Sequence, residues 1–262
     1  SNEVRGCSSV FDSRLEAMRH AEDQHGYCRI WSSLTNYTPG RPENTFTHTF
    51  WQSTLQIIDT NATTQQEFVH AAKNAKEAGF DGIEIHSSNG YLFHQFFNKK
   101  SNLREDQYGG SIENRARFFF ETLDKVKEIW PENRIGVRLN PSLNGTFGIE
   151  ATEETIPTFD HIIERLNHYD LAYLHLSEPF TDVSDIDFLV TEIAKRYRPR
   201  YNGNLMINAG FDQETGNAVI EEGNADLVAF GKLFISNPDL PERFAINAPM
   251  AQWDEDTFYT QG

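Results

Sequence analysis

The chain has 262 residues, of which 38% are hydrophobic and 13% aromatic, enough to build one large globular domain. Its 39 acidic and 23 basic residues leave a net charge of −16, which repels nucleic acid phosphates and anionic membrane surfaces. No apolar run reaches the roughly 18 residues that a membrane span needs, so we expect neither a nucleic acid nor a membrane as partner.

The amino-terminal residues and the cysteines bear on location. Residues 1–9, SNEVRGCSS, contain no apolar core of the kind that a signal peptide has. The two cysteines, Cys7 and Cys28, form no CxxC motif, and two thiols in a chain of this length are typical of a reducing compartment. We expect a cytoplasmic protein.

The first 65 residues show only a weak pattern of elements. Residues 13–26 predict a helix, and residues 27–31, YCRIW, predict a strand. The polar, threonine-rich sequence that follows is interrupted by Pro39 and Pro42. We interpret residues 32–65 as a long loop region on the top face of the fold, where long loops tend to carry function.

From about residue 66 onward, short apolar strands alternate with helices. Five consecutive strand-then-helix units favour a parallel sheet covered by helices, and their repetition favours a (β/α)8 barrel over an open sheet. No glycine-rich dinucleotide fingerprint follows the strands, which argues against a Rossmann fold. Strands are predicted over residues 81–86, 134–140, 171–177, 204–210 and 225–231, and helices over 66–80, 111–130, 152–169, 185–197, 212–223 and 237–246.

Several of these helices carry terminal signals. Ser111 with Asn114 can cap the second of them, and Pro131 follows its end. Thr152 opens the third helix, and Pro238 stands in the first turn of the last one.

The number of strands decides the predicted fold class. With the strand at 27–31 the chain has about six strands, whereas a closed barrel needs eight. We therefore predict an α/β protein whose residues 1–262 form a single, partial TIM-barrel domain, truncated on its amino-terminal side. A parallel sheet with open edges invites association, so we also expect a homo-oligomer.

In a barrel of this kind the active site lies at the carboxyl ends of the strands. The residues at these ends are mostly hydrogen-bond donors, and almost none is a carboxylate, which argues against a glycosidase pair. Among them only His86 and His175 are good metal ligands, so we expect no metal site.

His86, Asn89 and Tyr91 follow one strand and form the main candidate for catalysis. His86 and Asn89 are three residues apart and can both donate to one oxygen, which is oxyanion-type stabilisation. Tyr91 can act as a proton donor, because an ordinary tyrosine, with a pKa of about 10, is protonated at neutral pH. The alternative is a structural strand-end histidine with a packing aromatic, and it stays open.

The last two predicted strands end in INAG (207–210) and AFGK (229–232). Gly210 and Gly231 let backbone N–H groups approach a ligand, and Lys232 adds positive charge, which predicts the usual barrel phosphate site. Two tight turns with a surface lysine are the alternative. Arg138 ends a central apolar strand, where it must meet an anion, several carbonyls or an ion-pair partner.

Taken together, these segments resemble the old yellow enzyme family of FMN-dependent ene-reductases, which are built on a (β/α)8 barrel. The match runs from about residue 66 to residue 262, and DQYGGSIENRARF and FISNPDLPERF are its most specific motifs. The other matching segments are AGFDGIEIHSSNGYLFHQFF, GVRLNPS, LAYLHLSEP and the carboxyl-terminal DTFYTQG.

The resemblance implies roles for the candidate residues. His86 and Asn89 would hold a substrate carbonyl oxygen above the flavin, and Tyr91 would protonate Cα after hydride from the reduced flavin reaches Cβ. Arg138 would lie against the pyrimidine edge of the flavin. The remaining FMN contacts would be Gly210, Gly231 and Lys232 at the phosphate, and Phe258 and Tyr259 beside the isoalloxazine or the ribityl chain.

The sequence departs from the family pattern in several places. Lys232 stands where the family usually has arginine, so it would meet phosphate without a bidentate fork. In the strand at 27–31, Arg29 replaces a glutamine that contacts the flavin ring, and could fill flavin space or pair with the N1–C2=O2 edge. The family also carries two more strands before this one.

Three hypotheses follow for function. The first is an FMN-dependent ene-reductase that uses NAD(P)H to reduce activated C=C bonds of α,β-unsaturated carbonyl compounds. The second is a flavin-free descendant that polarises a carbonyl for isomerisation or cyclisation, without a redox step. The third is an inactive, truncated barrel fragment that is completed by oligomerisation.

Overall fold

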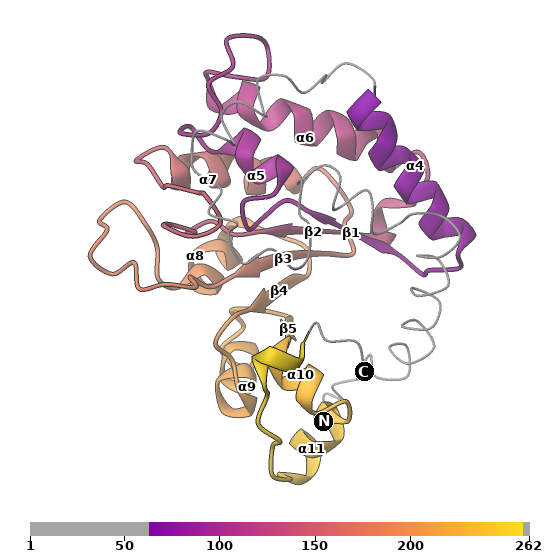
Figure 1. Cartoon of the computed structure of the whole chain (residues 1–262), viewed down its shortest axis with the longest axis vertical. Coiled ribbons are helices and arrows are strands. Elements are labelled where there is room, and N and C mark those ends of the chain that lie inside the picture. Colours follow the sequence, from indigo (N-terminus) through magenta and orange to yellow (C-terminus); the bar gives the residue numbers. More distant parts are fainter. Residues whose placement is uncertain (1–62, 259–262) are drawn as a thin grey trace.

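The structure is a computed structural model, and it describes residues 63–258 (Figure 1). The predicted helix at 13–26, the strand at 27–31 and residues 32–62 of the predicted loop region lie outside the described residues, as do Cys7 and Cys28. Within the described part, five parallel strands form one sheet in chain order. They are β1 (Ile83–His86), β2 (Ile135–Leu139), β3 (Tyr173–Ser177), β4 (Leu205–Asn208) and β5 (Leu227–Ala229).

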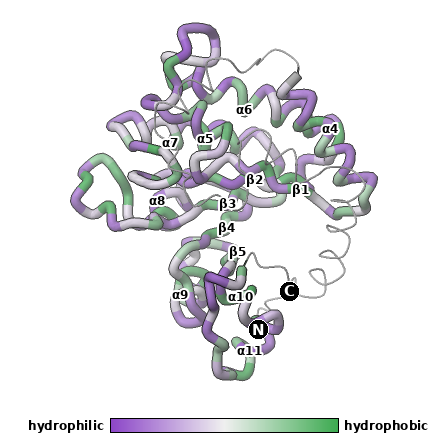
Figure 2. The backbone as a smooth tube through the Cα atoms, viewed as in Figure 1, coloured by the Kyte–Doolittle hydropathy of each residue, from purple (hydrophilic) through white to green (hydrophobic). Residues whose placement is uncertain are grey.

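All five strands predicted in this region are present, each shorter than predicted by two to four residues. The helices on one side of β1–β3 are α4 (Thr63–Glu77), α6 (Ile112–Val126) and α7 (Thr155–Leu166), and α6 lies between the other two (Figure 1). Hydrophilic and hydrophobic segments alternate along α4 and α6 (Figure 2), as the helical period of their sequences predicts. No helix among residues 63–258 combines the length and the apolar character that crossing a membrane requires.

The two faces of the sheet differ in chemistry. Residues in register on neighbouring parallel strands point to the same side, and Ile85, Val137 and Leu174 form one such apolar row that is almost fully buried. The opposite face carries the row His86, Arg138 and His175. We call the polar residues of this second side the polar face: Glu84, His86, Arg138, Tyr173, His175, Ser177 and Asn208.

Phenylalanine dominates the core between the apolar face and the helices. The run Phe118–Phe120 in α6 is buried, and the Phe118 ring stacks on Phe96 with centroids 4.6 Å apart. Phe96 belongs to α5 (Leu92–Phe97), a helix that the sequence did not predict. All six residues of α5 are buried, so it shows none of the amphipathic period by which a surface helix is recognised.

The helix starts were predicted with mixed success. Ser111 caps α6 as predicted, because its side chain accepts a hydrogen bond from the Asn114 backbone N–H at 3.3 Å. The third helix begins at Thr155 rather than at Thr152, whose hydroxyl instead accepts from the Glu154 N–H at 3.3 Å. Helix α9 (Gln213–Glu221) agrees with the prediction, and its start is capped by an Asp212–Thr215 capping box.

Two predictions of helix were wrong in their extent. The helix at 185–197 is reduced to α8 (Ile193–Tyr197), because the Glu178 carboxylate accepts from the N–H groups of Ile193 and Ala194 and makes a late helix start. The last predicted helix, 237–246, becomes α10 (Lys232–Ser236) followed by α11 (Leu240–Ile246). Pro241, not Pro238, occupies its first turn. Short 3-10 helices cover Glu132–Arg134, Arg198–Arg200 and Glu255–Thr257.

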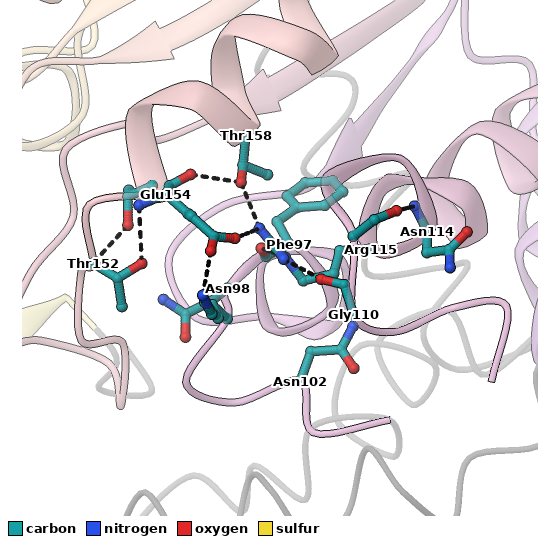
Figure 3. Close-up of polar contacts among 12 residues, drawn as sticks. Phe97, Asn98, Asn102, Gly110, Asn114, Arg115, Thr152, Glu154 and Thr158 are labelled. Atoms are coloured by element: carbon teal, nitrogen blue, oxygen red, sulfur yellow. Dashed lines mark hydrogen bonds and ion pairs between the residues drawn. The ribbon is translucent and has the colours of Figure 1, made fainter. Parts of the chain in front are cut away.

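The motif at 106–118, DQYGGSIENRARF, places one buried arginine where three segments meet (Figure 3). Arg115 is 1% exposed and donates to the carbonyl oxygens of Phe97 and Gly110 at 2.9 and 2.5 Å. It also donates to the Thr158 hydroxyl at 2.9 Å and pairs with the Glu154 carboxylate at 3.0 Å. Arg115 therefore ties the end of α5 to α6 and α7.

Candidate functional site

His86 and Tyr91 meet at the carboxyl end of β1. His86 is the last residue of the strand, and the next residue, Ser87, still donates to the Arg138 carbonyl of β2 at 2.9 Å. The rings of His86 and Tyr91 lie edge to face with centroids 4.9 Å apart. The predicted association of these two residues is thus present, and both side chains are half-buried.

Asn89 is anchored to the neighbouring strand's end. Its backbone is left-handed, with φ 53°, a conformation that asparagine tolerates better than most residues. Its side-chain oxygen accepts a hydrogen bond from the Asn140 amide at 3.1 Å. Asn140 was not among the predicted site residues, although its place one residue after β2 was the available signal.

The turn that follows Asn89 is clamped from α5. Gly90 has φ 76°, and a Cβ at this position would lie 2.2 Å from the Phe147 carbonyl oxygen, so only glycine fits. Its N–H faces His94 Nδ1 at 3.4 Å, and its carbonyl accepts from the Gln95 amide at 2.6 Å. His94 and Gln95 therefore position the turn that joins Asn89 to Tyr91.

Burial controls the charge of the site histidine. Burial lowers the pKa of His86 to about 4, the positive charge of Arg138 adds to this, and Glu84 opposes it. The imidazole is therefore uncharged at neutral pH and offers a neutral N–H donor. Burial also lowers the pKa of His94, to about 3, so this second ring is an uncharged acceptor for the Gly90 N–H.

Arg138 lies in the middle of the polar face. Burial lowers its pKa, but a guanidinium remains charged in a protein. With the Asn208 amide oriented so that its oxygen faces Arg138, that oxygen accepts from Nη2 at 2.9 Å and the amide nitrogen donates to the Ser177 hydroxyl at 2.6 Å. Arg138 Nε is buried without a partner among the described residues, so it remains available to a ligand.

The candidate phosphate site lies at the ends of β4 and β5. Gly210 has φ 82°, Gly231 precedes α10, and around both an added Cβ would meet nothing within 4 Å. This open space suits a ligand approaching the backbone. The Lys232 ammonium pairs with the Glu255 carboxylate and lies 5.9 Å from the Trp253 ring centroid, so in this structure it is directed to the carboxyl-terminal segment.

The remaining predicted flavin contacts are only partly described. Phe258 is half-buried and directly follows the 3-10 helix Glu255–Thr257. Tyr259 and Arg29 lie outside the described residues.

The arrangement suits one extended ligand. The carboxyl ends of parallel strands lie at the same end of the sheet, so His86 on β1 and Gly210 after β4 lie at that end together. They are separated by three strand spacings, about 14 Å. Among residues 63–258 no three His, Cys, Asp or Glu side chains gather as metal ligands would. A cavity of about 400 Å³ beside Glu178, Asp182 and Phe211 contains none of the predicted site residues.

Comparison with known proteins identifies the family. The model of the NADH:flavin oxidoreductase / NADH oxidase family matches residues 42–250. Putative 12-oxophytodienoate reductase 6 of Oryza sativa subsp. japonica is 43% identical over 207 residues, 79% of this chain and 51% of that protein. 12-oxophytodienoate reductase 2 of Arabidopsis thaliana is 40% identical over 195 residues, 74% of this chain and 51% of that protein.

Solved structures agree with this result. Morphinone reductase in complex with tetrahydroNAD aligns with a TM-score of 0.69 at 39% identity, over 76% of this chain and 52% of that one. The old yellow enzyme homologue from Zymomonas mobilis aligns with a TM-score of 0.69 at 33% identity, over 76% and 55%. The chain spans about half the length of the curated relatives it matches. The predicted fold class is confirmed: the five parallel strands are part of a barrel of this type.

The matched family model, the reductase relatives and the solved structures agree with one another, and the chain belongs to the NADH:flavin oxidoreductase / NADH oxidase family, the old yellow enzyme family.

Proposed function

We propose that the protein is an FMN-dependent ene-reductase that reduces activated C=C bonds of α,β-unsaturated carbonyl compounds with NAD(P)H. The observation that carries the proposal is the uncharged His86 packed against Tyr91 beside an anchored Asn89, at the carboxyl end of a strand of this family's barrel. Two neutral donors and a tyrosine are what a carbonyl oxygen and a carbon awaiting a proton require.

The residues of the polar face and of the last two strand ends fit FMN. Arg138 has an unpartnered buried Nε for the pyrimidine edge, and Gly210 and Gly231 leave open space for the phosphate. Bound FMN would supply the two-electron chemistry that links the nicotinamide to the alkene. His86 and Asn89 would hold the substrate carbonyl and polarise the conjugated double bond, and the Tyr91 hydroxyl would give its proton to Cα.

The relatives support the substrate class and the reductant. They are named as reductases of 12-oxophytodienoate and of morphinone, and both names denote ketones. Morphinone reductase is solved with tetrahydroNAD, which supports a nicotinamide nucleotide as the source of electrons.

The test is spectroscopic and kinetic. Protein reconstituted with FMN should show the flavin absorbance band, which NAD(P)H should bleach and an enone should restore. Tyr91→Phe should slow the enone-dependent step about 10²- to 10⁴-fold, because it removes the proton donor, and should leave the NAD(P)H-dependent bleaching close to wild type. A protein that takes up no FMN contradicts the proposal, and enone conversion without flavin would support the flavin-free alternative.

We further propose that the protein is a homo-oligomer. In the described sheet β1 and β5 are the edges, and exposed parallel edges favour pairing with another chain. Light scattering decides this, and a monodisperse monomer would contradict it. The single-domain assignment over 1–262 and the cytoplasmic location stay predictions.

A further inference from the structure

Glu84 is an acidic residue in an unusual place. It lies on the polar face, in register with Gly136 and Tyr173, one layer below the row of His86 and Arg138. Among the inward-facing residues of the five described strands it is the sole carboxylate. Its side chain is 28% exposed, so most of its charge is shielded from solvent.

The Glu84 side chain is hydrogen-bonded to His175 of β3, on the far side of β2. Its Oε2 lies 2.9 Å from His175 Nδ1, although β2 separates the two strands. Gly136 makes this possible because it stands between them in β2 without a side chain, and the Tyr173 ring fills the space where its Cβ would be. Burial raises the pKa of Glu84, but the His175 contact and the nearby charges outweigh it, so the net shift is downward.

This geometry assigns the proton of the pair. Because an ionised carboxylate only accepts, His175 Nδ1 must donate to Glu84. His175 Nε2 then points away from Glu84 and, like Arg138 Nε, is buried without a partner among the described residues. The face thus combines one fixed guanidinium, an uncharged His86 and one fixed carboxylate.

We infer that Glu84, fixed by His175, is the counter-charge of Arg138 on the polar face and lowers the electron affinity of the flavin held there. The inference rests on the proposed function. Two-electron reduction makes the isoalloxazine more negative, so a guanidinium favours it and a nearby carboxylate opposes it. Glu84 is a positioning and charge-balancing residue, and makes no contact with substrate.

The first test is the midpoint potential of the bound FMN in Glu84→Gln, which keeps the shape and removes the charge. The equilibrium should shift about tenfold toward reduced flavin, ~30 mV for a two-electron couple. Glu84→Asp draws the carboxylate back from His175 without removing it and should shift the potential in the same direction by less. Glu132→Gln removes an equal charge before β2 begins and should leave the potential at the wild-type value.

The second test needs no flavin. Proton NMR of the FMN-free protein follows the His86 ring, which is faced by Glu84, Arg138, His175, Tyr91 and His94. Loss of the Glu84 charge should move the His86 pKa below its value of about 4. If the protein binds no FMN, the proposed function fails while this titration still tests Glu84.

Two results would overturn the inference. One is a potential in Glu84→Gln equal to that of Glu132→Gln, together with an unchanged His86 titration. The other concerns Glu84→Asp, which serves if Glu84→Gln does not fold: a potential that stays constant or falls would show that the carboxylate does not oppose reduction. If the role of Glu84 were purely structural, both Glu84 variants would be less stable, but neither the midpoint potential nor the His86 pKa would change.

Discussion

Two histidines of the site are kept uncharged by burial, and each uses this state differently. His86 would offer a neutral N–H to the proposed ligand, whereas His94 accepts from the Gly90 backbone inside the protein. His94 is 1% exposed, so a proton on it would be an unpaired buried charge. The turn between Asn89 and Tyr91 therefore depends on the protonation state of a buried residue.

Acidification should destabilise the fold through His94. Its folded pKa of about 3 lies below its ordinary value of 6.5, so unfolding takes up a proton and the stabilisation present above pH 6.5 is lost as the pH falls toward 3. The loss approaches ~1.4 kcal/mol per pH unit for one histidine. His94→Asn keeps an acceptor near the Nδ1 position and cannot be protonated at these pH values. The free energy of unfolding, measured with urea between pH 6.0 and 4.5, should therefore fall less steeply with decreasing pH in this variant than in the wild type. Equal slopes in the two proteins would refute this account.

At the scale of elements, α5, α6 and α7 are joined by one side chain. The four hydrogen-bonded or charged contacts of Arg115 give each of its three guanidinium nitrogens a partner (Figure 3). The Glu154 carboxylate also pairs with Lys99, which follows α5. This network fixes the end of the helix whose start carries Tyr91, and so connects the family motif to the site.

Arg115→Met should lower the free energy of unfolding by about 3–5 kcal/mol, because the carbonyls of Phe97 and Gly110 and the Thr158 hydroxyl lose a buried donor. Arg117→Met, two residues on along α6, is the matched control. Arg117 is half-buried and contacts Gln107 and Asn114, so its removal should cost about 1 kcal/mol. Urea denaturation of both variants measures this, and similar losses would refute a special role for Arg115.

At the scale of the whole molecule, the sheet carries an apolar side toward the helices and a polar side on which the proposed ligand would lie. The His86 end and the Gly210–Gly231 end of the proposed site follow strands that are far apart in the sequence and in the strand order, β1 against β4 and β5. A ligand that bridges them links the stability of both ends of the sheet to its own binding.

FMN should therefore stabilise the whole protein, and its phosphate should matter. At a concentration 100 times its Kd, FMN should add about 2.7 kcal/mol to the free energy of unfolding. Riboflavin, which lacks the phosphate, should stabilise less at the same concentration because it cannot use Gly210, Gly231 and Lys232. Thermal unfolding with each flavin provides the comparison. Equal stabilisation by the two would place the phosphate elsewhere.

Local signals were sufficient for much of the fold and for part of the site. The period of the helices, the cap at Ser111 and the apolar strands depend on neighbours within a few residues, and these elements agree with the prediction. His86, Tyr91 and Arg138 could be proposed as site residues for a similar reason, because strand ends can be located from the sequence and the carboxyl ends of parallel strands lie together.

Features that depend on residues far apart in the sequence could not be predicted from such local signals. The predicted helix at 185–197 is shortened to α8, whose start is capped by Glu178. The sequence signal of α5 was hidden by complete burial, and Asn140 contacts the site through Asn89, 51 positions away. The sequence by itself determined the family, the strand order and the chemical types at the strand ends. Only the tertiary structure decided which side chains touch, and how burial and the Glu84–His175 contact distribute charge, because both depend on what surrounds each group in space.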